Sequence, residues 1–182
     1  MTTNELETGT FTDKRDGQVY RTVKMPDGKV WMAQNLNYKI ENSCCYANDD
    51  YIGKKYGRLY TWDAAMKACP TGWRLPSLPD WTNLVVAVGN TAEFGKGFPI
   101  KNLMVKEGWN VFGTDEFGFS ALPGGFRCEN GDFLGLGNNC VWWACGQSVW
   151  AGFAEACNLC GGYYAVFPYS NVGRGCSVRC VQ

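Results

Sequence analysis

Charged residues almost disappear from the last third of this 182-residue chain. Residues 1–127 contain 29 of the 34 Lys, Arg, Asp and Glu residues, and residues 128–182 contain only five. The late segment consists instead of short apolar and aromatic runs separated by Gly and Asn. Such runs are typical of antiparallel strands joined by tight turns. The segment therefore predicts a twisted, loop-rich sheet.

A single domain accounts for both parts of the chain. The length fits one domain, and 46% hydrophobic and 15% aromatic residues are ample for a packed core, which excludes disorder as the main state. No Pro- or Ser-rich linker separates the two parts near residue 128. We expect a flexible segment at residues 1–10 and one domain at residues 11–182.

Local signals place strands before helices in the first half. Alternating residues at 18–24 and 30–33 flank an Asp-Gly turn, which predicts a β-hairpin. Two short helices follow at residues 62–68 and 80–88, each after a Thr or Ser that can act as N-cap. The predicted class is α+β, with two short helices and a twisted antiparallel sheet. The late strands are expected at residues 119–122, 124–128, 133–136, 141–145, 153–159, 163–168 and 176–181.

Composition excludes several classes of function. Seventeen basic residues balance seventeen acidic ones, so neither nucleic acid nor an anionic membrane is expected as a partner. The chain has no His, which removes Ser–His and Cys–His catalysis and the commonest neutral metal ligand. No stretch reaches the roughly 20 apolar residues of a membrane span. Residues 1–12 are too polar for a signal peptide, so we expect synthesis in the cytoplasm.

The ten cysteines suggest a disulfide framework, but such frameworks belong to short secreted chains with small cores. Cys157 and Cys160 form a CxxC motif without the second pair that zinc needs, and no βαβ pattern favours a thioredoxin-like role. We expect free thiols between residues 140 and 160, and no cofactor. Calcium is the alternative, as a structural ion, because Asp and Asn occur in several loops.

Two further motifs have structural interpretations. Trp142 and Trp143 are adjacent, and adjacent strand residues point to opposite faces of a sheet. One indole is expected in the core and the other over the far face, with both largely buried. Acidic residues in turn-like contexts are interpreted as turn formers. They are Asp49, Asp50, Asp115, Glu116, Glu129 and Asp132.

Five ordered motifs resemble the Fibrobacter succinogenes major paralogous domain over about residues 10–182. They are Tyr56–Trp62, Ala68–Ser77, Gly118–Gly125, Trp142-Trp143 and Ser177–Val181. That family is similar to the formylglycine-generating-enzyme type of C-type-lectin fold. The resemblance implies that strands near residues 18–24 and 176–181 share one sheet, and that a loop-rich second lobe carries the ligand site. In an oxidising compartment it also implies a Cys69–Cys180 disulfide, with Cys44 and Cys45 as competing partners.

The chain departs from the family pattern after Trp143, where a mixture of Cys, Gly, Ser, Val, Phe, Tyr and Asn replaces the usual polar residues. This mixture resembles the C-terminal region of variable proteins of diversity-generating retroelements, in which Asn codons of a repeat are randomised. The resemblance implies a stable scaffold without catalysis and a variable ligand-binding region at about residues 140–176. The expected contact residues are Cys145, Gly146, Ser148, Val149, Trp150, Gly152, Phe153, Cys157, Cys160, Tyr163, Phe167, Tyr169, Asn171 and Gly173.

Two other functions stay open beside this binding module. An oxidase similar to the formylglycine-generating enzyme would use Cys145, Cys157 and Cys160, with or without copper. A non-diversified surface structural paralogue would have no specific ligand. For the binding module we expect a protein or another cell-surface ligand as partner, a monomeric chain, and a final place on a virion or cell surface.

Overall fold

The computed structural model of the chain describes residues 6–89, 98–160, 163–165 and 169–182. The predicted α+β class is confirmed. Its helices are α1 (Asp50–Tyr56), α2 (Trp62–Ala68) and α3 (Leu78–Ala87), with 3-10 turns at Tyr46–Asn48 and Lys101–Leu103. Its strands are β1 (Thr8–Thr12), β2 (Val19–Lys24), β3 (Val30–Met32), β4 (Ser43–Cys44), β5 (Leu59–Tyr60), β6 (Phe98–Pro99), β7 (Gly124–Arg127), β8 (Phe133–Leu136), β9 (Asn139–Gln147), β10 (Phe153–Cys160), β11 (Tyr163–Ala165), β12 (Ser170–Asn171) and β13 (Cys176–Ser177).

A three-stranded antiparallel sheet opens the fold, in the order β1-β2-β3. Strands β2 and β3 confirm the predicted hairpin. Strand β1 was not predicted, and it begins at Thr8, inside the segment expected to be flexible. The Thr and Phe residues of β1 favour extended backbone and pair with β2 along its whole length. The domain boundary expected at residue 11 is therefore too late.

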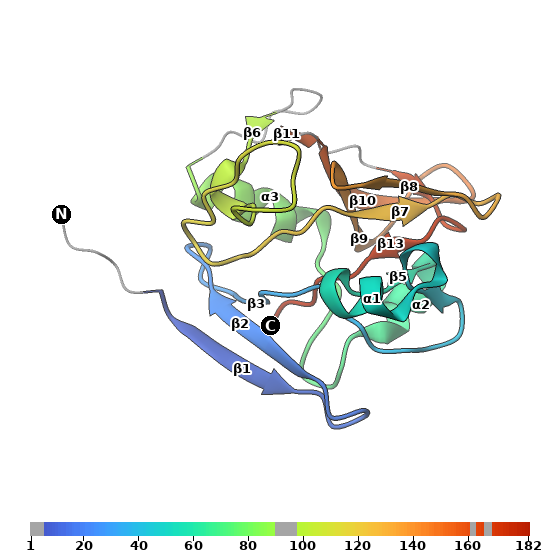
Figure 1. The fold of residues 1–182 in the computed structure, drawn as a ribbon, viewed down its shortest axis with the longest axis horizontal. Coiled ribbons are helices and arrows are strands. Elements are labelled where there is room, and N and C mark those ends of the chain that lie inside the picture. The colour runs from blue at the N-terminus through green and yellow to red at the C-terminus, as the bar shows by residue number, and fades with distance from the viewer. Residues whose placement is uncertain (1–5, 90–97, 161–162, 166–168) are drawn as a thin grey trace.

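The larger sheet has the order β4-β5-β13-β9-β10-β11-β6, with β12 and β7 attached to β10 and β9. Strands β7 to β11 and β13 lie close to the predicted runs, whereas β12 was not predicted and residues 119–122 form only an isolated bridge at Ala121. The sheet is mixed rather than antiparallel, because both β13 and β7 run parallel to β9. Figure 1 shows β9 and β13 next to each other, away from β1 and β2.

The C-terminal residues connect the two sheets. The expectation that the strands near 18–24 and 176–181 share a sheet holds only in part: β2 belongs to the small sheet and β13 to the large one, but Val181 forms an antiparallel bridge with Trp31 of β3. After β13 the chain leaves the large sheet and runs beside β3 (Figure 1). There Met32 N donates to Cys180 O (3.1 Å) and Gln182 N donates to Val30 O (2.9 Å). The chain end thus bridges the two sheets as a hydrogen-bonded segment.

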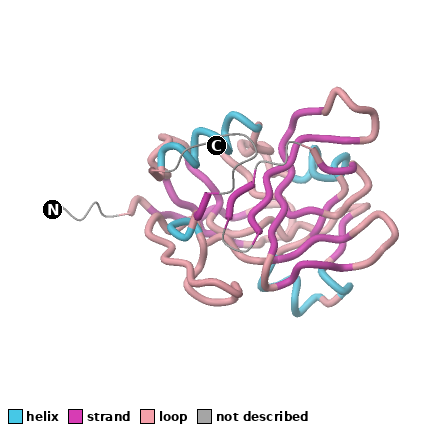
Figure 2. Tube along the Cα trace, turned by 90° about the horizontal axis from the view of Figure 1, so that it is seen from above, coloured by secondary structure: helices cyan, strands magenta, loops and turns pink. Residues whose placement is uncertain are grey.

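Helices α2 and α3 occur where local signals place them, and Figure 2 shows the helices mainly around the strands. A capping box fixes the start of α3: Asp80 N donates to Ser77 Oγ (3.2 Å), and Ser77 N donates to the Asp80 carboxylate (2.7 Å). Burial opposes ionisation of Asp80, but hydrogen bonds from Arg74 and Ser77 outweigh it and hold the pKa of this carboxyl well below its usual range.

Helix α1 is a third helix, which the sequence analysis missed. It has seven residues with Gly53 in its interior, and glycine in a helix interior argues against a helix. Gly53 is buried, and a Cβ at this position would collide with Cys45 Sγ. The close approach to Cys45 explains why a weak helix former stands here. Asp49, interpreted as a turn former, is the N-cap of α1 and accepts from Tyr51 N (2.7 Å).

Strand β9 separates two hydrophobic cores. Trp142 packs into the core with Trp31, Trp81 and Phe119. Trp143 packs into the other core and donates from its indole Nε1 to Tyr60 O (2.7 Å). Both indoles are buried, with 2% and 0% of their residue surfaces exposed. The prediction that the two tryptophans enter opposite faces is confirmed.

One disulfide joins the end of α2 to the C-terminal segment. Cys69 is the residue that follows α2, and Cys180 lies beside β3, with 6.0 Å between their Cα atoms. This is the pair that the family resemblance implied, and Cys44 and Cys45 do not form a disulfide. The bond closes a segment of the chain with a sequence separation of 111 residues.

Replacing Trp143 by Ala should lower the free energy of unfolding by about 3–5 kcal/mol, because the change leaves a large cavity in a packed core. The matched control is Trp150→Ala, since this indole is 62% exposed and its loss should cost within about 0.5 kcal/mol. Urea denaturation measures both values. Equal destabilisation by the two substitutions would contradict the assignment of Trp143 to the core.

Reduction of the Cys69–Cys180 bond should lower the free energy of unfolding by about 2–5 kcal/mol, because the bond restricts a long loop of the unfolded chain. Peptide mapping without reductant should recover the two cysteines in one cross-linked species. A Cys128→Ser variant is the control, since Cys128 forms no disulfide and should leave both results unchanged. Separate Cys69 and Cys180 peptides from oxidised protein would contradict the pairing.

Candidate functional site

The β9–β10 hairpin ends in a loop that exposes large apolar side chains. Val149, Trp150 and Phe153 are 87%, 62% and 41% exposed. We refer to residues 148–153 as the hairpin tip. Three exposed apolar residues within six positions form a concentrated apolar surface on a domain whose other large side chains pack mostly inside.

Backbone hydrogen bonds determine the path of the hairpin tip. Ser148 N donates to Phe153 O (3.1 Å), and Phe153 N donates to Trp150 O (3.2 Å). Gly152 has a φ of 81°, a region that favours glycine, and it allows the chain to turn back into β10. The hydroxyl of Ser148 accepts from Trp150 N (3.0 Å). The tip is therefore a closed turn rather than an open loop.

Neighbouring segments hold the tip in place. Val172 N donates to Gly152 O (3.0 Å), and Trp62 N at the start of α2 donates to Val172 O (3.0 Å). The ring of Tyr169 meets the Trp150 indole edge-on, with 5.1 Å between ring centroids. These contacts orient the exposed indole before any ligand arrives.

A pocket of about 290 Å³ lies between the tip and the start of α2. We call it the tip pocket. Its lining is mixed: three residues are aromatic, and polar groups come from one carboxylate, one amide and one hydroxyl. The lining residues are Trp62, Asp63, Gln147, Ser148, Trp150, Ala151, Gly152, Phe153 and Val172. A combination of aromatic side chains with a few polar groups is common in binding sites.

Most of the expected contact residues lie at or near this surface, but Cys160 does not, because it pairs with Asn139 at the other end of the β9–β10 hairpin. Val149, Trp150, Gly152, Phe153 and Gly173 are exposed. The partly buried ones are Cys145, Gly146, Ser148, Cys160, Tyr169 and Asn171. The backbone of Tyr163 belongs to β11, but its side chain and the whole of Phe167 lie outside the described residues. Only Ser148, Trp150, Gly152 and Phe153 among the expected residues line the tip pocket.

Cys157 was expected among the contact residues, and this expectation is wrong. The residue is buried, with 0% exposed surface, and packs in the core that contains Trp81 and Trp142. The cause is that both faces of β10 pack against a core: Ala154 and Ala156 face one core, and Cys157 and Leu159 face the other. The CxxC motif therefore has one member inside the core.

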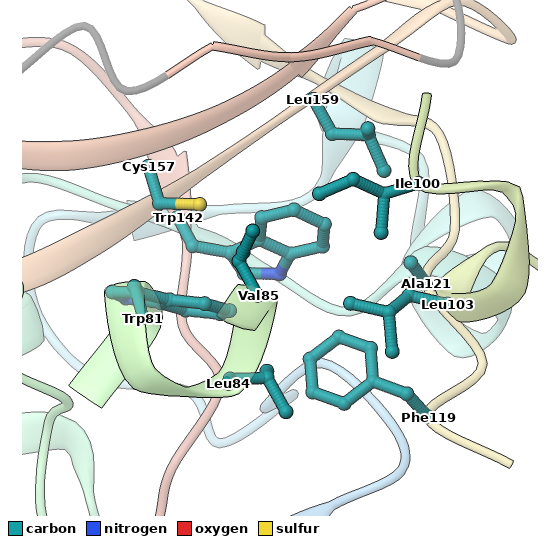
Figure 3. A pocket seen from close by; sticks show the side chains of 10 residues that line it. All are labelled: Trp81, Leu84, Val85, Ile100, Leu103, Phe119, Ala121, Trp142, Cys157 and Leu159. Atoms are coloured by element: carbon teal, nitrogen blue, oxygen red, sulfur yellow. The ribbon is translucent and has the colours of Figure 1, made fainter. Parts of the chain in front are cut away.

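The cavity beside Cys157 is not a ligand site. Ten mainly apolar side chains line it (Figure 3), and its volume is about 10 Å³. This volume is about that of one water-sized probe. The rings of Trp81 and Trp142 lie against each other in its wall, with 5.4 Å between their centroids. The cavity is a packing gap in the core.

The structure does not bring the three thiols of the oxidase alternative together. Cys160 pairs with Asn139 at one end of β9, and Cys145 lies six residues further along this strand, roughly 20 Å away. Burial raises the pKa of the Cys145 thiol, so little thiolate forms at neutral pH. Cys157 lies opposite Trp142, between the other two.

Two loop carboxylates that were interpreted as turn formers, Asp115 and Asp132, have structural partners. Asp115 accepts from the backbone N and the hydroxyl of Ser120, both at 2.8 Å. Asp132 takes part in the β7–β8 turn, with its backbone N donating to Asn130 (3.1 Å). Among the described residues, no group of three or more Cys, Asp or Glu side chains is arranged to hold a metal ion.

Sequence reasoning missed five residues of the tip pocket: Trp62, Asp63, Gln147, Ala151 and Val172. Trp62 and Asp63 stand 84 or more residues before Gln147, in a segment read only as a helix start. Their place beside the tip depends on the Trp62–Val172 hydrogen bond, which joins distant parts of the chain. No local signal reveals such a contact.

The fold and the tip define a small α+β domain that presents an aromatic loop from a hairpin packed on both faces. Residues 23–182 match the model of the Fibrobacter succinogenes major domain, so the chain belongs to that family, as its motifs indicated. No curated protein and no solved structure matches the chain significantly. In the described part of the chain, every helix is too short or too polar to cross a bilayer.

Replacing Val149, Trp150 and Phe153 together by Ser should change the free energy of unfolding by no more than about 0.5 kcal/mol for each, because these side chains are exposed. A single Cys157→Tyr substitution should cost about 1–3 kcal/mol, because it overpacks the core. Urea denaturation compares the two variants. A stable Cys157→Tyr variant beside an unfolded triple variant would reverse the distinction between surface and core.

Proposed function

We propose that the protein is a ligand-binding module whose hairpin tip contacts the ligand, without catalysis. The observation that carries the proposal is the exposure of Val149, Trp150 and Phe153 on a tip that backbone hydrogen bonds hold in shape. Exposed aromatic residues on a rigid loop bind with little loss of conformational entropy. Aromatic residues are also enriched among those that contribute most to binding energy.

The residues that stabilise the domain are separate from those that are exposed at the hairpin tip, and this separation supports a diversified tip. The exposed side chains of Val149 and Trp150 can change without opening either core, because Trp142 and Trp143 supply the packing of the hairpin. A variable protein of a diversity-generating retroelement needs this separation. Its scaffold, on our proposal, is a C-type-lectin-like fold of the formylglycine-generating-enzyme type. The C-terminal segment beside β3 and the Cys69–Cys180 bond favour that fold.

Thiol chemistry favours binding over the oxidase alternative. Burial raises the pKa of the Cys145 thiol, one of the three thiols that an oxidase would use. Thiols of this kind are poor nucleophiles at neutral pH. A structural paralogue without a ligand would have no use for a pocket lined by Trp150 and Phe153.

The partner class that we propose is a protein or another ligand on a cell surface, met by a monomeric chain displayed on a virion or cell. The proposal includes no nucleic acid, no membrane insertion and no cofactor. Calcium stays a separate possibility for a structural ion in the Asp- and Asn-containing loops.

Display libraries test the capacity of the tip to bind. Randomising Val149, Trp150 and Phe153, with Gly152 and Cys157 fixed, should yield binders to unrelated target proteins that are enriched at least tenfold over the starting pool. The control library randomises exposed apolar residues elsewhere. They are Tyr51, Phe112 and Leu134. Equal enrichment from both libraries, or none from the tip library, would contradict the proposal.

Neighbouring DNA tests diversification itself. We expect a reverse transcriptase gene beside a near-identical repeat that differs from this coding sequence only at adenines. Sequencing of the gene in a population should find variation at the Val149 and Trp150 codons and none at Trp142 and Trp143. Uniform codons and the absence of a second repeat would contradict diversification. The remaining functions would then be a binding module without diversification and the structural paralogue.

A further inference from the structure

The lining of the tip pocket contains one charged side chain, that of Asp63. From this and from the surrounding aromatic residues we infer that the tip pocket accepts a cationic side chain, an arginine or a lysine, of the partner protein. The inference rests on the proposed binding function and names the chemistry that the same site recognises. Three features of the tip pocket support the inference: the free carboxylate, the aromatic side chains in its wall and its size.

The Asp63 carboxylate is available to a ligand. The residue is exposed in the first turn of α2, and it pairs with no Lys or Arg side chain anywhere in the described ranges. Lys67 lies one turn further along α2 and does not line the tip pocket. It lines a separate pocket together with Arg15 and Glu41, and Asp63 lines this second pocket as well. Within the tip pocket, no Lys or Arg side chain competes for the carboxylate.

Aromatic groups around this carboxylate favour a cation over a neutral group. Trp62, Trp150 and Phe153 all contribute to the pocket wall. The face of an aromatic ring attracts a guanidinium or ammonium group, and Trp does so most strongly. A planar guanidinium can stack on an indole while it donates to a carboxylate, which a neutral side chain of the same length cannot do.

The remaining polar groups and the volume fit one long side chain. Gln147 and Ser148 line the pocket and supply oxygen acceptors beside Asp63. The volume of about 290 Å³ lies at the lower end of the range for small-molecule sites. This is suitable for a single side chain that protrudes from a protein surface. The exposed Val149 and Phe153 would then contact the apolar surface around that side chain.

A titration with a capped amino acid tests the inference directly. The probe is N-acetyl-arginine methylamide, and the matched neutral probe is N-acetyl-citrulline methylamide, which has the same shape without the charge. The readout is the NMR signal of the Trp150 indole N–H, assigned with a Trp150→Phe variant. We expect a saturable shift with the arginine probe and at least about fivefold weaker binding of the citrulline probe. Equal binding of the two probes, or no saturable shift, would overturn the inference.

Two variants identify the group responsible. Asp63→Asn should remove the preference for arginine, whereas Lys67→Gln should keep it, because Lys67 lies outside the tip pocket. A preference that survives in Asp63→Asn would overturn the inference. If a variant does not fold, the comparison of the arginine and citrulline probes on the wild-type protein still tests the inference. Tip libraries that yield binders without any arginine preference would leave the binding function in place and remove only this inference.

Discussion

The rest of the structure depends on the hydrogen bonds that the buried guanidinium of Arg179 donates. Its five N–H groups make five hydrogen bonds, to the Asn35 side chain and to the carbonyls of Met32, Phe119 and Ser120. The group is fully buried, and burial lowers its pKa to about 10, yet no carboxylate in the described part of the chain pairs with it. Carbonyl dipoles therefore take the place of a counter-ion. Because these acceptors come from β3, from the segment that follows it and from the loop before β7, Arg179 holds together parts of the chain that no single sheet connects. Loss of this side chain would leave several buried carbonyls without a donor.

The same centre explains why the hairpin can carry a binding surface. Asn35 accepts from Arg179 and also from the indole of Trp142, so the polar centre fixes one face of β9. Trp143 fixes the other face through the carbonyl of Tyr60. A hairpin packed on both faces has little freedom to bend, and its tip projects from a rigid base. The tip side chains can then be chosen for binding, because stability comes from elsewhere.

Local signals predicted the β2–β3 hairpin, α2, α3 and most late strands, because caps, turns and alternation act within a few residues. Local signals failed where contacts with residues outside the segment determine its structure. Helix α1 was missed because Gly53 in its interior argues against a helix. Glycine is required there by the close approach of Cys45, which lies outside the helix. Cys157 was placed on the surface because the resemblance to variable proteins implied contacts throughout residues 140–176, whereas both faces of β10 are covered by a core. The exposed tip was predicted from its composition, but the role of Asp63 in the pocket required the spatial pairing of α2 with the tip.

The position of the disulfide affects how the protein survives damage. An exposed turn that meets other molecules is also where proteases cut most readily. The hairpin tip lies between Cys69 and Cys180 in the sequence, so a cut at Trp150 falls inside the covalent ring that these two residues close. Both halves remain one molecule after such a cut, with β9 and β10 still paired between the two cores. A nicked domain would therefore keep its scaffold and lose only the continuity of its binding loop.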